Sequence, residues 1–185
     1  MSSASFGRPD LGWDPERMAG LRDEDFQAPD LIGTVEGWRA WNVLREPPAF
    51  GTTPKLESAT FKYWWTPRVK ARATCERNSA HVPGETCTCG FYAAKTLPHL
   101  RAMGYQAYDE EAKRICVVGR LAMWGKVIEG DQGWRSEYAY PNTIYVPFEA
   151  WRLARPIQRA YGVPVRLLNL LDSTKLPEDA KDIGG

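Results

Sequence analysis

The sequence predicts an α+β fold: a mostly antiparallel β-sheet, or a partly open barrel, with short helices and a zinc-binding loop. Runs of strand length that are rich in aromatic and alternating apolar residues are separated by Gly and Pro turns, which is typical of antiparallel strands. Three cysteines and a histidine fall within fifteen residues, a pattern that indicates a metal loop in a reducing compartment. With 185 residues and 43% hydrophobic content, the chain can bury one core.

The two ends of the chain differ in composition from its middle. Residues 1–30 are rich in Gly, Pro, Asp and Arg, and residues 172–185 are similarly polar. Such segments bury too little apolar surface to offset the entropy of ordering them. We therefore expect a flexible N-terminal arm over 1–30, a single zinc-stabilised globular domain over 31–171 and a flexible C-terminal tail over 172–185.

The first elements of the domain are two strands and a short helix. Residues 38–44 and 58–64 alternate apolar with polar positions, and Pro and Gly punctuate 47–54 between them. This predicts an antiparallel strand pair. Further on, Thr96 can cap a helix whose apolar positions share one face and which Gly104 can end.

The second half of the domain is predicted to contain a hairpin followed by helical cover. Residues 114–128 form the most apolar run of the chain, interrupted by Gly, and favour long, bent β structure. A turn at 130–133 leads into a returning strand at 134–140. Prolines open two helical segments, 147–153 and 156–162, and a glycine ends the second.

Four residues form the candidate metal site: Cys75, His81, Cys87 and Cys89. Three thiolates and one imidazole complete the closed tetrahedral sphere that structural Zn²⁺ prefers. Gly90 allows the backbone to fold closely around the sulfurs. The spacing therefore predicts a structural zinc ion whose loop pins the first strand pair to the rest of the core.

Two other readings of the cysteines stay open, because the commoner Cys-x2-Cys spacing is absent. Cys87 and Cys89 can be a buried free pair or a redox-active Cys-x-Cys. A catalytic zinc is disfavoured, because it needs an open coordination position and the deaminase signature is not met. Cys116, within the apolar run, is expected to be a small buried hydrophobic residue.

Residues 62–72, called here the basic–aromatic stretch, interleave stacking side chains with cations. Such a mixture can contact a partner protein, or bind single-stranded nucleic acid through stacked bases and neutralised phosphates. Alternatively, Tyr63 and Trp65, or Phe61 and Trp64, belong to the core and the cations form a solvated face. The candidate contact residues are Lys62, Tyr63, Trp64, Trp65, Arg68, Lys70 and Arg72.

Charge and hydropathy exclude several classes of protein. Twenty-four basic and twenty-three acidic residues leave a net charge of +1. The overall charge therefore gives no argument for binding a polyanion, and any nucleic-acid surface would have to be a local patch. No apolar run approaches the roughly 20 residues that cross a bilayer, and residues 1–10 lack the core of a signal peptide. We therefore expect a cytoplasmic protein with no membrane partner.

A set of short motifs is spread over roughly residues 37 to 146. They are Gly-Trp-Arg-Ala-Trp at 37–41, Cys75, the zinc-like loop and following strand at 81–94, Leu-Ala-Met-Trp-Gly-Lys-Val at 121–127, Gly-Trp-Arg at 133–135 and Ala-Tyr-Pro at 139–141. Together they resemble a family of uncharacterised small proteins of bacteria and their phages. The resemblance implies a shared fold and metal site, without an activity.

The sequence favours a zinc-stabilised, non-enzymatic binding module, an adaptor or regulator that recognises another macromolecule near Trp64 and Trp65. The partner expected first is another protein. One alternative is a single-stranded nucleic-acid-binding protein that uses the cations of the basic–aromatic stretch. Another is an enzyme that uses a cysteine or a polar pocket around Arg135, Glu137 or Asp131, although no catalytic or phosphate-binding motif is present.

Overall fold

The computed structural model describes residues 33–44, 53–60, 62–75, 82–85, 87–103, 108–109 and 113–168. The expected arm at 1–30 and tail at 172–185 lie outside these residues, as does His81. The strands are β1 (Val35–Leu44), β2 (Leu56–Ser58), β3 (Trp64–Trp65), β4 (Ala71–Arg72), β5 (Phe91–Ala94), β6 (Tyr108–Asp109), β7 (Arg114–Glu129), β8 (Gly133–Pro147) and β9 (Val165–Leu168); the helices are α2 (Leu97–Ala102), the 3₁₀ helix η2 (Phe148–Leu153) and α3 (Ala154–Tyr161).

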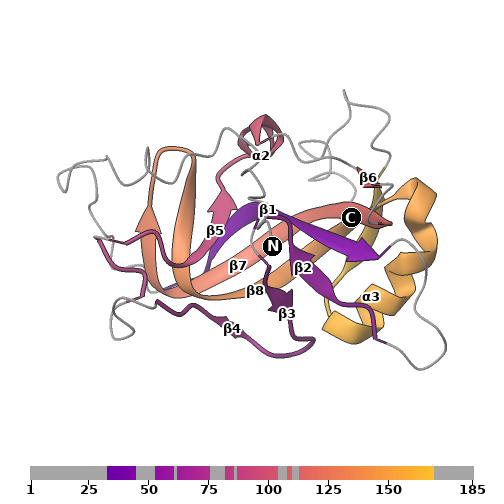
Figure 1. Cartoon of the computed structure of the whole chain (residues 1–185), viewed down its shortest axis with the longest axis horizontal. Coiled ribbons are helices and arrows are strands. Elements are labelled where there is room, and N and C mark those ends of the chain that lie inside the picture. The colour runs from indigo at the N-terminus through magenta and orange to yellow at the C-terminus, as the bar shows by residue number, and fades with distance from the viewer. Residues whose placement is uncertain are drawn as a thin grey trace, which may run out of the picture.

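All of these strands belong to one mixed sheet, which confirms the predicted α+β class (Figure 1). Its order is β3-β2-β1-β5-β8-β7-β6, and β1 also pairs with β7, so that β1, β5, β8 and β7 form a ring. Strands β2, β3 and β6 extend beyond this ring, and the sheet is therefore partly ringed without being a barrel. The pairings are antiparallel except for β8 with β9.

The long hairpin of β7 and β8 confirms the predicted strands at 114–128 and 134–140. β8 continues beyond the expected end, through Pro141 to Pro147. A bulge permits this: Arg120 lies opposite Thr143 and Leu121 lies opposite Pro141, which leaves Asn142 as an extra residue. A bulge is one of the few places in a sheet that tolerate a proline, since proline has no N–H for the ladder.

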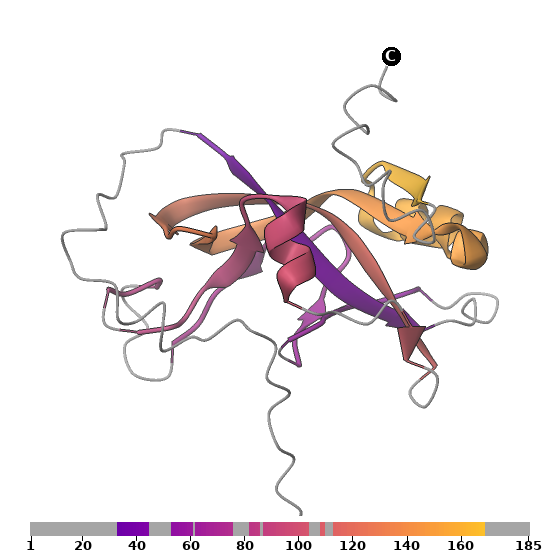
Figure 2. The same ribbon diagram turned by 90° about the horizontal axis from the view of Figure 1, so that it is seen from above.

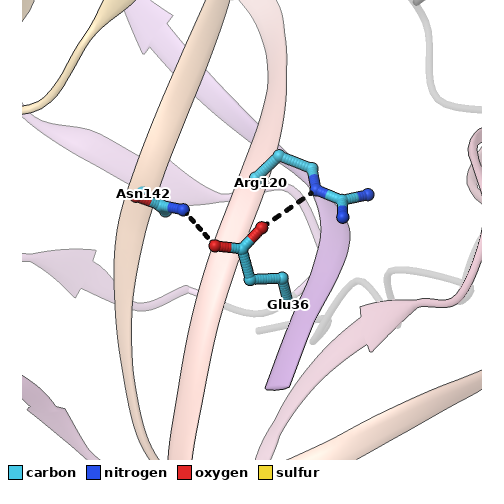
Figure 3. A network of polar contacts seen from close by, with 3 residues as sticks. All are labelled: Glu36, Arg120 and Asn142. Atoms are coloured by element: carbon cyan, nitrogen blue, oxygen red, sulfur yellow. Dashed lines mark hydrogen bonds and ion pairs between the residues drawn. The ribbon is translucent and has the colours of Figure 1, made fainter. Parts of the chain in front are cut away.

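A polar network joins three neighbouring strands at this bulge (Figure 3). The carboxylate of Glu36 on β1 lies 3.6 Å from Nε of Arg120 on β7, and it accepts a hydrogen bond from Nδ2 of Asn142 on β8. The extra residue of the bulge therefore points its amide back across the sheet. The guanidinium of Arg120 also lies over the ring of Trp38, 4.9 Å from its centroid.

The predicted antiparallel pair of 38–44 and 58–64 exists, but its second strand is shorter than expected. β1 pairs with β2 at Trp41 and Ser58. The amide of Ser58 donates to the carbonyl of Tyr63 over 2.9 Å. The chain therefore turns back between Ser58 and Tyr63, which brings β3 alongside β2.

Two groups of buried side chains hold the sheet to its helices. The larger includes Trp41, Leu121 and Ile144 from the sheet with Leu153 and Ile157 from η2 and α3. The smaller packs α2 against the other side of β1 and β7, and its members are Trp38, Ala40, Ala94, Leu97, Leu100, Met103, Cys116 and Tyr145. Figures 1 and 2 show α2 beside the sheet and α3 at the end away from the β7–β8 turn.

Cys116 is buried as expected, and burial raises the pKa of its thiol to about 12. Thr96 and Gly162 act as the sequence predicted, whereas the expected helix end at Gly104 lies outside the described residues. The side chain of Thr96 caps α2 by accepting from the amide of His99 over 3.3 Å, and Gly162 ends α3 with a φ of 69°. The segment at 147–153 is a 3₁₀ helix rather than an α-helix. No helix in the described ranges has the length and apolar character needed to cross a membrane.

The hydroxyl of Tyr161 connects α3 to strands β2 and β3. It accepts a hydrogen bond from the amide of Leu56 and donates to the carbonyl of Trp65, each over 2.8 Å. Tyr161 is 2% exposed, so water does not replace this hydroxyl readily if it is removed. One side chain therefore satisfies backbone groups of both β2 and β3.

We predict that Tyr161→Phe lowers the free energy of unfolding by about 1–3 kcal/mol, because a buried donor and a buried acceptor lose their partner. Urea denaturation monitored by fluorescence measures the change. Tyr138→Phe is the matched control, since the Tyr138 hydroxyl bonds to no residue within the described ranges. Equal stability of the two variants would contradict the role of Tyr161.

Candidate metal centre

Three of the four predicted ligands are brought together by the fold. The sulfurs of Cys75, Cys87 and Cys89 lie within 4.8 Å of one another. Cys75 is buried, and the other two are half-buried. Tetrahedral thiolates at a metal–sulfur distance of about 2.3 Å stand about 3.8 Å apart, so a small closing movement suffices. These cysteines lie close enough to hold a metal ion.

Strand β8 explains why the cysteines meet. β4 and β5 pair with successive parts of β8, Ala71 lying opposite Ala139 and Phe91 opposite Ser136. Cys75 follows β4 by three residues, and Cys89 precedes β5 by two. The chain thus leaves β8 and returns to it at neighbouring positions. The cysteine loop therefore connects β4 to β5, two strands that both pair with β8. The sequence had led us to expect that the loop holds the strand pair 38–44 and 58–64 to the core, and the structure shows this different connection.

A tight turn presents Cys87 to the other two sulfurs. The amide of Cys87 donates to the carbonyl of Gly84 over 3.5 Å, and the amide of Gly84 lies 3.3 Å from the Cys87 sulfur. An amide donor at this place can offset part of the negative charge of a metal-bound sulfur. The turn therefore supplies part of the polar environment that a metal-bound sulfur needs.

Gly90 allows the loop to approach β8 closely, as the sequence indicated. Its φ is +132°, a conformation that residues with a side chain rarely adopt. A Cβ atom at this position would lie 3.3 Å from both Cβ of Arg135 and the carbonyl oxygen of Ser136. The backbone can pass here because the residue has no side chain.

Two side chains beneath the loop were not found by sequence reasoning as parts of the site. Arg135 on β8 and Tyr92 on β5 lie directly opposite each other. The guanidinium Nη1 of Arg135 donates to the carbonyl of Cys87. The hydroxyl of Tyr92 donates to the carbonyl of Thr88 over 2.6 Å. Only the register between β5 and β8 reveals this pair, and the spacing along the chain does not.

The electrostatics of the cluster depend on whether a cation is bound. Burial, together with hydrogen bonds to Cys75 and Cys87, raises the pKa of the Cys89 thiol to about 12. Burial also raises the pKa of Tyr92, while the charge of Arg135 acts in the opposite direction. A thiol that stays protonated near neutral pH loses its proton outright when it binds a metal ion. Metal binding at Cys89 therefore competes with protons.

The basic–aromatic stretch divides into core and surface. Trp65 is 1% exposed, and its ring packs edge-on against Trp41 and Tyr63 at centroid distances of 6.0 and 5.6 Å. Tyr63 is half-buried and also packs against Phe91. Strand alternation turns these two rings toward the core and Trp64 outward, so Trp65 is too buried to contact a partner, whereas a contact at Tyr63 stays a prediction.

Arg68 belongs to the framework rather than to a free cationic surface. Its amide donates to the hydroxyl of Tyr140 over 2.7 Å, and its guanidinium donates to the carbonyl of Arg159 over 3.0 Å. The guanidinium also lies against Gly162 at the end of α3. This arginine therefore fastens the turn after β3 to α3.

Five of the seven candidate contact residues are exposed: Lys62, Trp64, Arg68, Lys70 and Arg72. Lys70 and Arg72 lie over the ring of Tyr138, at 4.6 and 5.7 Å from its centroid. Tyr138 in turn stacks on Trp124, with centroids 6.1 Å apart and an angle of 18° between the rings. β4 thus brings two cations onto an aromatic pair of the β7–β8 hairpin.

No protein-family model matches the chain, and the searches of curated proteins and of solved structures return no match either. The resemblance to small bacterial and phage proteins therefore stays a prediction. The function has to be inferred from the cysteine centre and from the surfaces around it.

Proposed function

We propose that this protein is a zinc-stabilised, non-enzymatic binding module, an adaptor or regulator that recognises another macromolecule. The observation that supports it is the position of Cys75, Cys87 and Cys89, which close the junction of two strands on β8. A metal ion at such a junction stabilises strands that are too short to be held by packing alone. In this role it fixes the position of the neighbouring surface and takes part in no reaction.

Zinc is the metal that the donors favour. Thiolates are soft ligands, and three of them with one imidazole form a closed site that suits Zn²⁺. His81 is the fourth ligand in this proposal, because it lies between Cys75 and Cys87 in the chain. A closed sphere of four protein ligands leaves no position for a substrate, so the zinc is structural.

The metal has a specific mechanical task in this fold. β4 has two residues and pairs with β8 at two positions. One further backbone hydrogen bond extends this pairing, from the amide of Ala73 to the carbonyl of Glu137 over 2.8 Å. Such a short ladder stabilises little by itself. Structural zinc contributes on the order of 10 kcal/mol to folding in small modules. The zinc therefore anchors β4 and the exposed cations that it presents.

The surface around Trp64 is the proposed contact with a partner protein. Trp64 is 44% exposed and lies on β3, where the described sheet order ends. Lys62 is also exposed. Large aromatic side chains that stay exposed at a strand edge are typical of protein interfaces, where they supply apolar area and few mobile torsions.

The enzyme alternative receives no support from the residues it would use. Arg135 is engaged with the Cys87 carbonyl, and Glu137 lies 3.5 Å from Arg72. Asp131 is exposed in the turn between β7 and β8. These three polar groups therefore do not converge on a common point where a substrate could react.

We expect one zinc ion per chain in the purified protein, because the four ligands form a closed site. Native mass spectrometry measures the ion. His81→Ala, Cys87→Ala and Cys89→Ala should lose it and melt at a lower temperature, and a chelator should lower the melting temperature of the parent.

Cys116→Ala is the matched control, since this cysteine is buried away from the other three. It should retain the ion. A folded parent without metal, or equal loss from Cys116→Ala, would contradict the zinc site and would favour the redox reading of Cys87 and Cys89.

We predict that Trp64→Ala abolishes capture of the partner protein from extracts of the source cells, while stability changes by less than about 0.5 kcal/mol. Trp151→Ala is the matched control. Trp151 is 55% exposed on η2, so this variant removes the same kind of exposed side chain from another part of the surface. Quantitative mass spectrometry of captured proteins compares the two variants. Identical capture by both would refute a contact at Trp64.

A second candidate, single-stranded nucleic-acid binding, is favoured by one observation, the placement of Lys70 and Arg72 over Tyr138. Cations beside stacked rings can meet phosphates and bases together. Removing both cations should then weaken binding of a fluorescent oligonucleotide and reduce the salt slope by about 0.7 per lost phosphate contact. Arg155→Ala on α3 is the control. A flat salt response of the parent would dismiss this candidate.

A further inference from the structure

Arg135 is a buried cation without a carboxylate partner in the described part of the chain. It is 8% exposed, and its guanidinium donates to the carbonyl of Cys87. No carboxylate among the described residues lies within ion-pair distance of it. The buried carboxylate of Glu57, by comparison, pairs with Arg114. Because a buried charge is costly unless it is compensated, an anion is expected beside Arg135.

The backbone that carries the cysteines is what this guanidinium contacts. Arg135 donates to the carbonyl of Cys87. Tyr92, opposite Arg135 in the sheet, donates its hydroxyl to the carbonyl of the next residue, Thr88. Arg135 and Tyr92 therefore hold the backbone between Cys87 and Cys89. Thiolates at these positions would supply the missing negative charge.

A count of charges gives the same answer. Three thiolates bring three negative charges and Zn²⁺ brings two positive ones, so a site with a neutral fourth ligand has one net negative charge. The single positive charge of Arg135 balances it. A fourth thiolate or a carboxylate would leave the buried group negative, whereas a neutral imidazole keeps the balance.

We propose that Arg135 is the counter-ion of the metal centre and sets its ligands to three thiolates and one neutral donor. This inference rests on the proposed zinc site. Arg135 does not contact the metal and is a positioning residue: its charge balances the net negative charge of the metal-bound cluster, and its hydrogen bond fixes the carbonyl of Cys87. Residues around metal ligands that act in this way typically change affinity about 10–100-fold when replaced.

The experiment compares two full-length variants that separate charge from hydrogen bonding. Arg135→Lys keeps the positive charge, and Arg135→Gln keeps a hydrogen-bond donor without it. Zinc affinity is measured by chelator competition that starts from the zinc-loaded protein, so a variant that folds only with metal still gives a value. We expect Arg135→Gln to bind zinc about 10–100-fold more weakly than the parent, and Arg135→Lys to recover most of that loss.

The pH profile gives a readout that a purely structural role would not change. Without the positive charge, protons compete better for the thiolates, so the pH at which half the sites hold zinc should rise in Arg135→Gln and stay near the parent value in Arg135→Lys. Arg120→Gln is the control, because it removes a guanidinium that pairs with Glu36 on another part of the sheet (Figure 3). It should leave affinity and pH profile unchanged.

Three outcomes would overturn the inference: Arg135→Gln binds zinc as tightly as the parent, Arg135→Lys and Arg135→Gln lose equal affinity, or Arg120→Gln loses as much as Arg135→Gln. A parent protein that holds no zinc would overturn the proposed zinc site as well, and the metal content of the parent therefore separates the two failures.

Discussion

The pairing of β7 with β8 is the interaction on which the other elements depend. β1 and β6 pair with β7, whereas β4, β5 and β9 pair with β8. β2 and β3 reach this hairpin only through β1. Because β8 has 15 residues, three separate strands can share its length. The cysteine cluster and the α3 attachment are thus both consequences of where shorter strands meet one long hairpin.

The cysteine cluster was accessible to sequence reasoning because its members are close together along the chain. Cys75, Cys87 and Cys89 lie within fifteen residues, and the glycine after them signals a close approach of the backbone. The residues beneath the loop were not accessible. Arg135 and Tyr92 are 43 positions apart, and only the register of β5 against β8 places them opposite each other. A shift of β5 by one residue would send the side chain of Tyr92 to the other face, away from Arg135.

The same limit explains the partial success with the basic–aromatic stretch. Alternation showed that either Trp64 or Trp65 would be buried, but a two-residue strand offers too little pattern to decide which. In the structure Trp65 is buried and Tyr63 is partly buried against the same core. This matches the alternative in which Tyr63 and Trp65, rather than Phe61 and Trp64, belong to the core. The hairpin, α2 with its Thr96 cap and the glycine stop of α3 were correct, since each depends on local chemistry. β9 was missed because its parallel pairing with β8 needs the intervening helices to return the chain.

The cysteine cluster and α3 occupy opposite ends of the same hairpin (Figures 1 and 2). At one end three cysteines lie close enough to hold a metal ion, and at the other end apolar packing and the Tyr161 hydroxyl hold α3. Cooperative units of a protein can open separately when few contacts link them. Under the proposed zinc site, loss of the metal would therefore loosen β4 and the cations beside it, while the α3 end would keep its own contacts.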